Sequence, residues 1–225
     1  AIAGPYLGED NRLFRVEIHR AGNIGAATDV NTALFKWSRH NGAVASSLIA
    51  DAPVGVFSVQ VEKPELFAVG NLIEVSDDLV ELATGVYEDR IAHAKHTRGL
   101  MRRVVTVNLQ TRRISWEDPT VVDPLLAPFH AALPQPMRRV AHAKITQWDG
   151  LQAVTSGDIV LLDGVVIEFG GNNLVAGDYW QFATRTVNRS VERLIDAPPR
   201  GTRHAFYPLA AIHRSRAVTA DEIVF

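Results

Sequence analysis

Alternation of aromatic and polar residues constrains the fold of this chain more than any other feature. In residues 34–39 and 178–182, large aromatic side chains alternate with polar ones, which is the period of a β-strand with one buried face. The first segment runs into His40-Asn41-Gly42 and the second follows Gly177, and pairs of Gly with Asn or Asp are typical of tight turns. The sequence therefore predicts a mainly β chain.

The same period recurs along the chain. Residues 13–19 place Phe14, Val16 and Ile18 on one face of a strand and three polar residues on the other. Trp37 shares a strand face with Phe35, so we expect it to be buried. We expect a further strand over 56–62 and a short helix within 79–96. Three hairpins are predicted: 34–39 with 43–49, 100–109 with 114–116, and 158–169 folded back at Asp163-Gly164.

A proline-rich segment divides the chain. Prolines at both ends and in the middle of residues 119–136 interrupt any helix there, so this segment reads as a rigid connector. We therefore expect two packed β-rich lobes of sandwich or barrel type, formed by residues 1–118 and 137–225. No flexible Gly/Ser linker separates them, which favours packing over independent movement.

Composition excludes several classes of function. The 225 residues contain no cysteine, which removes disulfides, thiolate zinc sites, iron–sulfur clusters and cysteine nucleophiles. The 23 basic residues balance 25 acidic ones, whereas a nucleic-acid binder normally has a basic excess. No apolar run is long enough to cross a membrane, and the first residues lack the pattern of a signal peptide. We expect no cofactor.

The candidate site residues each have a simpler explanation. Asp149, Asp163 and Glu168 can include a glycosidase pair, which needs two acids about 5–9 Å apart, but turns explain most acids of this region. His93 and His96 are spaced i, i+3 and lack the pattern of a zinc helix, so we predict no metal site. The aromatic candidates for stacking on a sugar are Trp148, Tyr179 and Trp180, and alternation places the last two on opposite strand faces.

Six islands of sequence resemble, in order, a bacterial domain family of uncharacterised function. They are residues 14–19, 35–42, 72–78, 147–150, 177–180 and 200–210. Members of that family are large proteins that are often encoded in loci for phage-tail-like contractile injection particles. The chain is similar to their C-terminal portion, because it lacks a preceding segment with Gln-Gln-Gly-Arg and Asp-Ala-Asp-Trp-Asn motifs. The family carries no established catalytic residues.

The resemblance implies a non-enzymatic structural or adhesion module of a phage-tail-like particle. Its partners are then other particle subunits, copies of itself or a cell-surface glycan, with no nucleic acid and no membrane span. Such a protein is made in the bacterial cytoplasm and is later particle-associated or extracellular. The alternative is a carbohydrate-active enzyme or glycan-binding spike. A cleft that gathers two or more acids with an exposed Trp favours this alternative.

Overall fold

The fold is mainly β, as the alternation predicted, and its sheets are antiparallel. A computed structural model of the chain describes residues 5–83, 99–123, 126–201, 213–214 and 223–224. Helical structure there is limited to short elements: α1 (Asp78–Ala83), η1 (Pro64–Leu66), η2 (Ala127–His130), η3 (Arg139–Ala141) and η4 (Leu162–Gly164).

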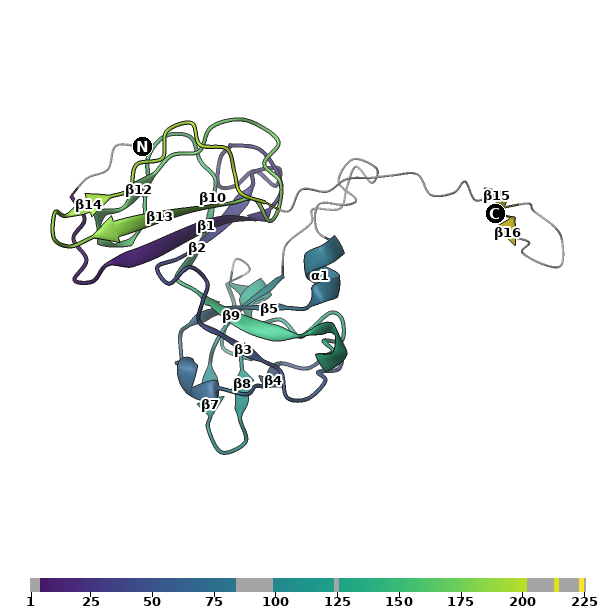
Figure 1. Cartoon of the computed structure of the whole chain (residues 1–225). Coiled ribbons are helices and arrows are strands. Elements are labelled where there is room, and N and C mark those ends of the chain that lie inside the picture. The colour runs from purple at the N-terminus through teal and green to yellow at the C-terminus, as the bar shows by residue number, and fades with distance from the viewer. Residues whose placement is uncertain (1–4, 84–98, 124–125, 202–212, 215–222, 225) are drawn as a thin grey trace.

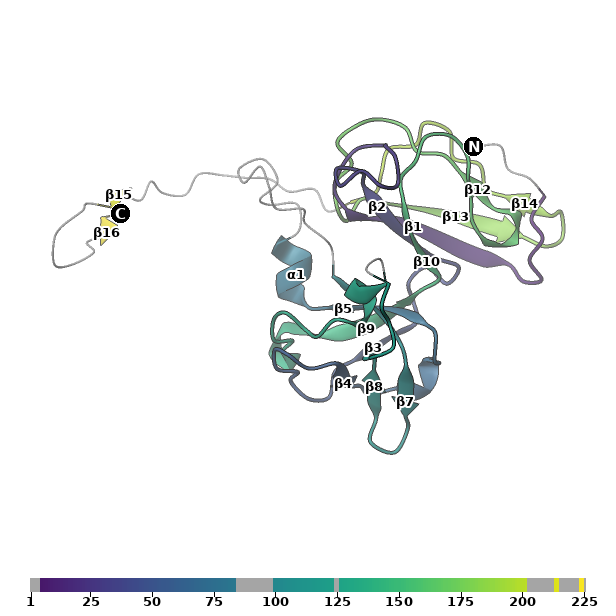
Figure 2. The same cartoon turned by 180° about the vertical axis from the view of Figure 1, so that it is seen from behind.

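Five strands form the first sheet, in the order β10-β2-β1-β13-β14. The long strand β1 lies at its centre and pairs with β2 on one side and β13 on the other. Figure 1 shows this sheet on one side of the molecule, and Figure 2 shows the same grouping from behind. Its strands are β1 (Arg12–Arg20), β2 (Leu34–Ser38), β10 (Gly150–Ala153), β13 (Tyr179–Arg185) and β14 (Ser190–Val191).

The second and third sheets lie together on the other side of the molecule (Figures 1 and 2). The second sheet has the order β3-β9-β5-β6 and the third has the order β4-β8-β7. The bounds of these strands are β3 (Ala45–Ser47), β4 (Ser58–Gln60), β5 (Leu72–Ser76), β6 (Leu100–Arg103), β7 (Thr106–Asn108), β8 (Arg113–Ser115) and β9 (Lys144–Trp148). Two small pairs complete the described strands: β11 (Ile159–Val160) with β12 (Val166–Ile167), and β15 (His213–Arg214) with β16 (Ile223–Val224).

Two hydrophobic cores cover the outward faces of the two large sheets. The first core packs Phe14, Val16 and Ile18 of β1 beneath the β11–β12 pair and the segment that follows it. The second core lies between the second and third sheets and includes Ile73 of β5 and Ile114 of β8. Trp37 is 6% exposed and belongs to the first core, which confirms its predicted burial.

The chain passes between the first and second sheets at two adjacent places. One crossing joins β2 to β3, and the other joins β9 to β10 through Asp149 alone. Asp149 holds the crossings together, because its Oδ2 accepts a hydrogen bond from the Arg39 amide at 2.7 Å and its own amide donates to Trp37 O at 2.8 Å. Two backbone segments far apart in sequence are therefore fixed at the junction of the sheets.

The turn predicted at Asn41-Gly42 forms, but the strands that flank it do not pair with each other as predicted. Asn41 and Gly42 both have positive φ angles, 57° and 65°, and the Ala43 amide donates to His40 O. However, β2 pairs with β1 and β10, while β3 pairs with β9. The turn directs the chain from one sheet to the next, because its flanking strands find partners elsewhere. The hairpin predicted over 158–169 forms as the pair β11–β12. The one predicted over 100–116 forms only in part, as the pair β7–β8, because residues 100–103 form β6 and pair with β5 in the second sheet.

Strand pairing crosses the boundary expected between the lobes. Strands from residues 1–118 pair with strands from residues 137–225 in both large sheets, as in β1–β13 and β5–β9. Leu133, within the 119–136 segment, is buried in the second core and forms backbone hydrogen bonds with Val56 and Gly55. The proline-rich segment therefore does not coincide with the division between the sheets.

The helix predicted within 79–96 corresponds in part to α1, which ends at Ala83. His93 and His96, the metal candidates, lie outside the described residues. Within the described part of the chain, no helix has the length and apolar character needed to cross a membrane.

Candidate functional site

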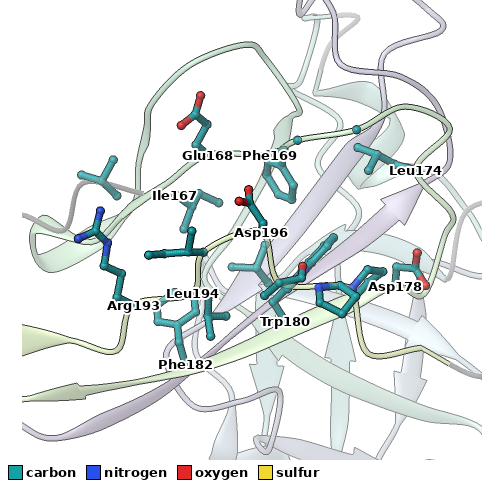
Figure 3. Close-up of a pocket in the computed structure, with 18 of the residues that line it drawn as sticks. Ile167, Glu168, Phe169, Leu174, Asp178, Trp180, Phe182, Arg193, Leu194 and Asp196 are labelled. Carbon is teal, nitrogen blue, oxygen red and sulfur yellow. The ribbon is translucent and has the colours of Figure 1, made fainter.

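A pocket of about 670 Å³ opens on the first sheet, on the face that carries the first core. Its floor is formed by Val16 of β1 and by Trp180 and Phe182 of β13, which alternate onto the same face. Residues 166–174 form one wall and residues 191–199 form the other. Figure 3 shows these side chains around the pocket. The volume falls within the range of about 300–1,000 Å³ that is common for small-molecule sites.

Neighbouring groups fix the orientation of the Trp180 ring. The indole Nε1 donates a hydrogen bond to Ala197 O in the opposite wall at 2.9 Å. The Phe169 ring meets Trp180 in an edge-on arrangement, with 5.7 Å between ring centroids. Because Trp180 is only partly buried, a fixed aromatic surface is available at the floor of the pocket.

Carboxyl groups surround this aromatic floor. Glu168 and Asp196 are exposed, and Asp178 is half-buried directly before β13. Figure 3 shows these three side chains distributed around the pocket. Burial raises the pKa of Asp178 above its ordinary value, because a desolvated carboxylate is less stable in its charged form. Arg193 provides a positive charge on the same wall as Asp196.

Two of the six carbohydrate-site candidates from the sequence meet in this pocket, Trp180 and Glu168. Tyr179 lies on the opposite face of β13, as alternation predicted, with the guanidinium carbon of Arg15 3.6 Å from its ring centroid. Asp163 adopts a left-handed conformation in η4, and its Oδ2 lies 4.0 Å from Arg39 Nη1. Asp149 binds the Arg39 amide at the crossing between sheets.

Trp148, the remaining candidate, is 5% exposed and belongs to a buried ionic cluster between the first and second sheets. We call this the Lys36 cluster; its members are Glu17 and His19 of β1, Lys36 of β2, Glu74 of β5 and Trp148 of β9. Lys36 Nζ lies 2.5 Å from both carboxylate oxygens of Glu74 and 3.2 Å from Glu17 Oε1. The Trp148 indole donates to Glu74 Oε2 at 3.0 Å, and its ring lies 4.3 Å from Lys36 Nζ.

His19 completes the Lys36 cluster without a hydrogen bond from its Nδ1, which is buried 3.8 Å from Glu74 Oε1. Burial and the charges of Lys36 and Arg20 lower the pKa of His19 well below its ordinary value. The four charged or titratable residues are each 5% exposed or less, so they are inaccessible to a substrate. Their arrangement joins the two sheets through charge pairs and hydrogen bonds.

Sequence reasoning missed the Lys36 cluster because its residues alternate with apolar ones, as residues on a solvent-facing strand surface do. Glu17 alternates with Val16 and Ile18, and Lys36 alternates with Phe35 and Trp37. The weak signal was the combination of acids and a lysine on several predicted strands that are rich in apolar residues. In the described ranges, no three His, Cys, Asp or Glu side chains are placed to hold a metal ion.

Comparison with known proteins identifies a family and no function. A model described as a family of unknown function, DUF6519, matches residues 1–216. No curated protein matches the chain, and no solved structure matches it.

Proposed function

The chain belongs to the DUF6519 family of unknown function, and from the geometry of its pocket we propose that it is an adhesion module that binds a saccharide. The observation that carries this proposal is the half-buried Trp180 ring at the floor of a pocket lined by Glu168 and Asp178.

Saccharide recognition needs an apolar surface and hydrogen-bonding groups close to it. The C–H face of a sugar ring is apolar and packs on an indole ring, while its hydroxyl groups donate to carboxylates and amides. The pocket supplies both kinds of group, with Asn172 and Asn173 beside the acids. Its aromatic floor is held in place by the hydrogen bond from Trp180 to Ala197 O, so a ligand meets an ordered surface.

We propose that the module binds the saccharide and does not hydrolyse it. Of the three acids that the sequence suggested for hydrolysis, Glu168 alone lines the pocket, and Asp149 is engaged with the Arg39 amide. A glycosidase is the second candidate, favoured by the presence of both Glu168 and Asp178 in one pocket. We place the module on a phage-tail-like particle because of the sequence resemblance described above.

The test is calorimetric titration of the purified chain with a panel of soluble oligosaccharides. We expect one class to bind, and we expect Trp180→Ala to weaken its binding at least tenfold, because buried aromatic anchors dominate the binding energy of such sites. Tyr179→Ala is the matched control, since it removes the neighbouring aromatic ring from the opposite strand face. Circular dichroism checks that each variant is folded.

Three results would contradict the proposal. Failure of every oligosaccharide to bind contradicts saccharide recognition, and equal loss of binding in Trp180→Ala and Tyr179→Ala contradicts the location. Release of shorter sugars, abolished by Glu168→Gln or Asp178→Asn, identifies a glycosidase in place of a binding module.

A further inference from the structure

The pocket carries more negative than positive charge. Its lining includes Glu168, Asp178, Glu192 and Asp196 against Arg193 as the cation. Among the residues that the structure describes, no ion pair joins any of these side chains to another. Glu192 is partly satisfied by a hydrogen bond from the Ala183 amide at 2.9 Å. Complementary charge is therefore expected from a ligand rather than from the pocket itself.

Asp178 is the acid closest in sequence to the aromatic floor. It lies directly before β13 and precedes Trp180 by two residues, and both side chains line the pocket while Tyr179 points to the other face of the strand. Its backbone is fixed, because Asp178 O accepts from the Ile18 amide at 2.8 Å and Asp178 N donates to Val175 O at 3.1 Å.

The environment of Asp178 favours a cation. Asp178 is half-buried, and its side chain lies close to Gly201, where a Cβ atom would lie 2.5 Å from Asp178 Oδ1. Among the described residues, Asp178 has no ion-pair partner. Because its carboxylate is partly desolvated, an ion pair with a ligand ammonium group is stronger there than the same pair in water. The face of the neighbouring Trp180 ring also attracts cations.

We infer that the ligand of this pocket is an amino sugar with a free ammonium group, which contacts Asp178 while the sugar ring packs on Trp180. This inference rests on the proposed function. An N-acetylated sugar of the same shape lacks the charge, and an acidic sugar is repelled by the surrounding carboxylates. Arg193 is exposed and does not reverse the balance of charge.

The experiment compares two tetrasaccharides with the same backbone. The β-1,4-linked glucosamine tetramer carries ammonium groups, and the β-1,4-linked N-acetylglucosamine tetramer is neutral. We expect calorimetry to show at least tenfold tighter binding of the charged tetramer. Asp178→Asn should remove most of this preference and leave binding of the neutral tetramer within about twofold.

Asp158→Asn is the matched control for Asp178→Asn. Both acids directly follow a glycine, but Asp158 is exposed and does not line the pocket. If Asp158→Asn reduces the preference as much as Asp178→Asn does, the preference comes from the overall charge of the protein, and the inference is wrong.

The remaining outcomes separate the inference from the proposed function. Equal affinity for the two tetramers overturns the inference and supports saccharide binding. Absence of binding by both tetramers, with another neutral oligosaccharide bound in a Trp180-dependent manner, overturns the inference alone. Failure of all sugars overturns both. If tetralysine binds more tightly than the glucosamine tetramer, the ligand is a basic peptide and the inference of an amino sugar is wrong.

Discussion

Lys36 forms ion pairs with two carboxylates that are buried with it between the sheets. Its ammonium group contacts Glu74 on the second sheet and Glu17 on the first, and each of the three residues is at most 5% exposed. We expect Lys36→Met to lower the free energy of unfolding by about 3–5 kcal/mol, because it leaves the buried Glu74 carboxylate without its cation, whereas Glu17 keeps its ion pair with Arg15. Urea denaturation measures this change.

Lys63→Met is the matched control for Lys36→Met. Lys63 is exposed, and we expect its replacement to change stability by no more than about 0.5 kcal/mol. Adding Glu17→Gln and Glu74→Gln to Lys36→Met should recover part of the loss, since uncharged side chains are less costly to bury. Similar stability of the two lysine variants would show that the Lys36 cluster does not join the sheets.

Alternation along single strands predicted several elements correctly. Residues 13–19 lie within β1, and Phe14, Val16 and Ile18 all enter the first core. The local pattern could not predict that the polar face of β1 is also buried, because the covering strand β5 lies more than 50 residues away in sequence. For the same reason the Asn41-Gly42 turn was predicted and the partners of its flanking strands were not.

The pocket was only partly predictable from sequence. Alternation placed Trp180 and Tyr179 on opposite faces of one strand, which the structure confirms. The wall formed by residues 191–199 has no regular period, and it reaches Trp180 through the Ala197 carbonyl. A contact of this kind depends on the path of an irregular loop, which strand periodicity does not describe.

The crossing from β9 to β10 depends on the absence of a side chain at Gly150. Gly150 lies opposite Trp37 in the strand pair, and a Cβ atom there would lie 2.3 Å from Trp37 Nε1. We expect Gly150→Ala to lower the free energy of unfolding by about 1–3 kcal/mol, as overpacking of a filled site does. Thermal denaturation and urea denaturation both report it.

Gly170→Ala is the matched control for Gly150→Ala. No atom lies within 4 Å of the position that a Cβ would take at Gly170, so we expect a change within about 0.5 kcal/mol. In a Trp37→Leu background, Gly150→Ala should cost less than in the parent, because the two sites are in contact. An equal cost in both backgrounds would mean that Trp37 is not the obstacle.

At the scale of the whole molecule, the layers run from the first core through the first sheet, the Lys36 cluster and the second sheet to the second core. The two cores are held by apolar packing, whereas the layer between the sheets combines the Lys36 cluster with a small apolar cluster of Leu72, Met101 and Trp148, against which Leu151 of the first sheet packs. Conditions that change charge therefore act on the contact between the sheets through the Lys36 cluster.

Acidification is the direct test of that layer. His19 faces Lys36 of β2, Glu74 of β5 and Arg20 of its own strand, and its pKa is lowered well below the ordinary value of 6.5. Below about pH 6.5 the unfolded chain binds a proton at His19 that the folded protein does not bind. The free energy of unfolding should therefore fall with decreasing pH, by up to about 1.4 kcal/mol per pH unit until the folded His19 is also protonated.

Replacing the histidine separates this effect from general acid denaturation. We expect His19→Leu to flatten the loss of stability between pH 6.5 and the onset of carboxylate protonation, when midpoints of urea unfolding are compared across that range. His142→Gln serves as the control, because His142 is exposed and pairs with Asp78 outside the Lys36 cluster. Because His142 is not buried as His19 is, we expect His142→Gln to keep the pH dependence of the parent protein. A parental pH dependence in His19→Leu would show that the layer between the sheets does not respond to His19 protonation, and that other groups set the acid limit of the fold.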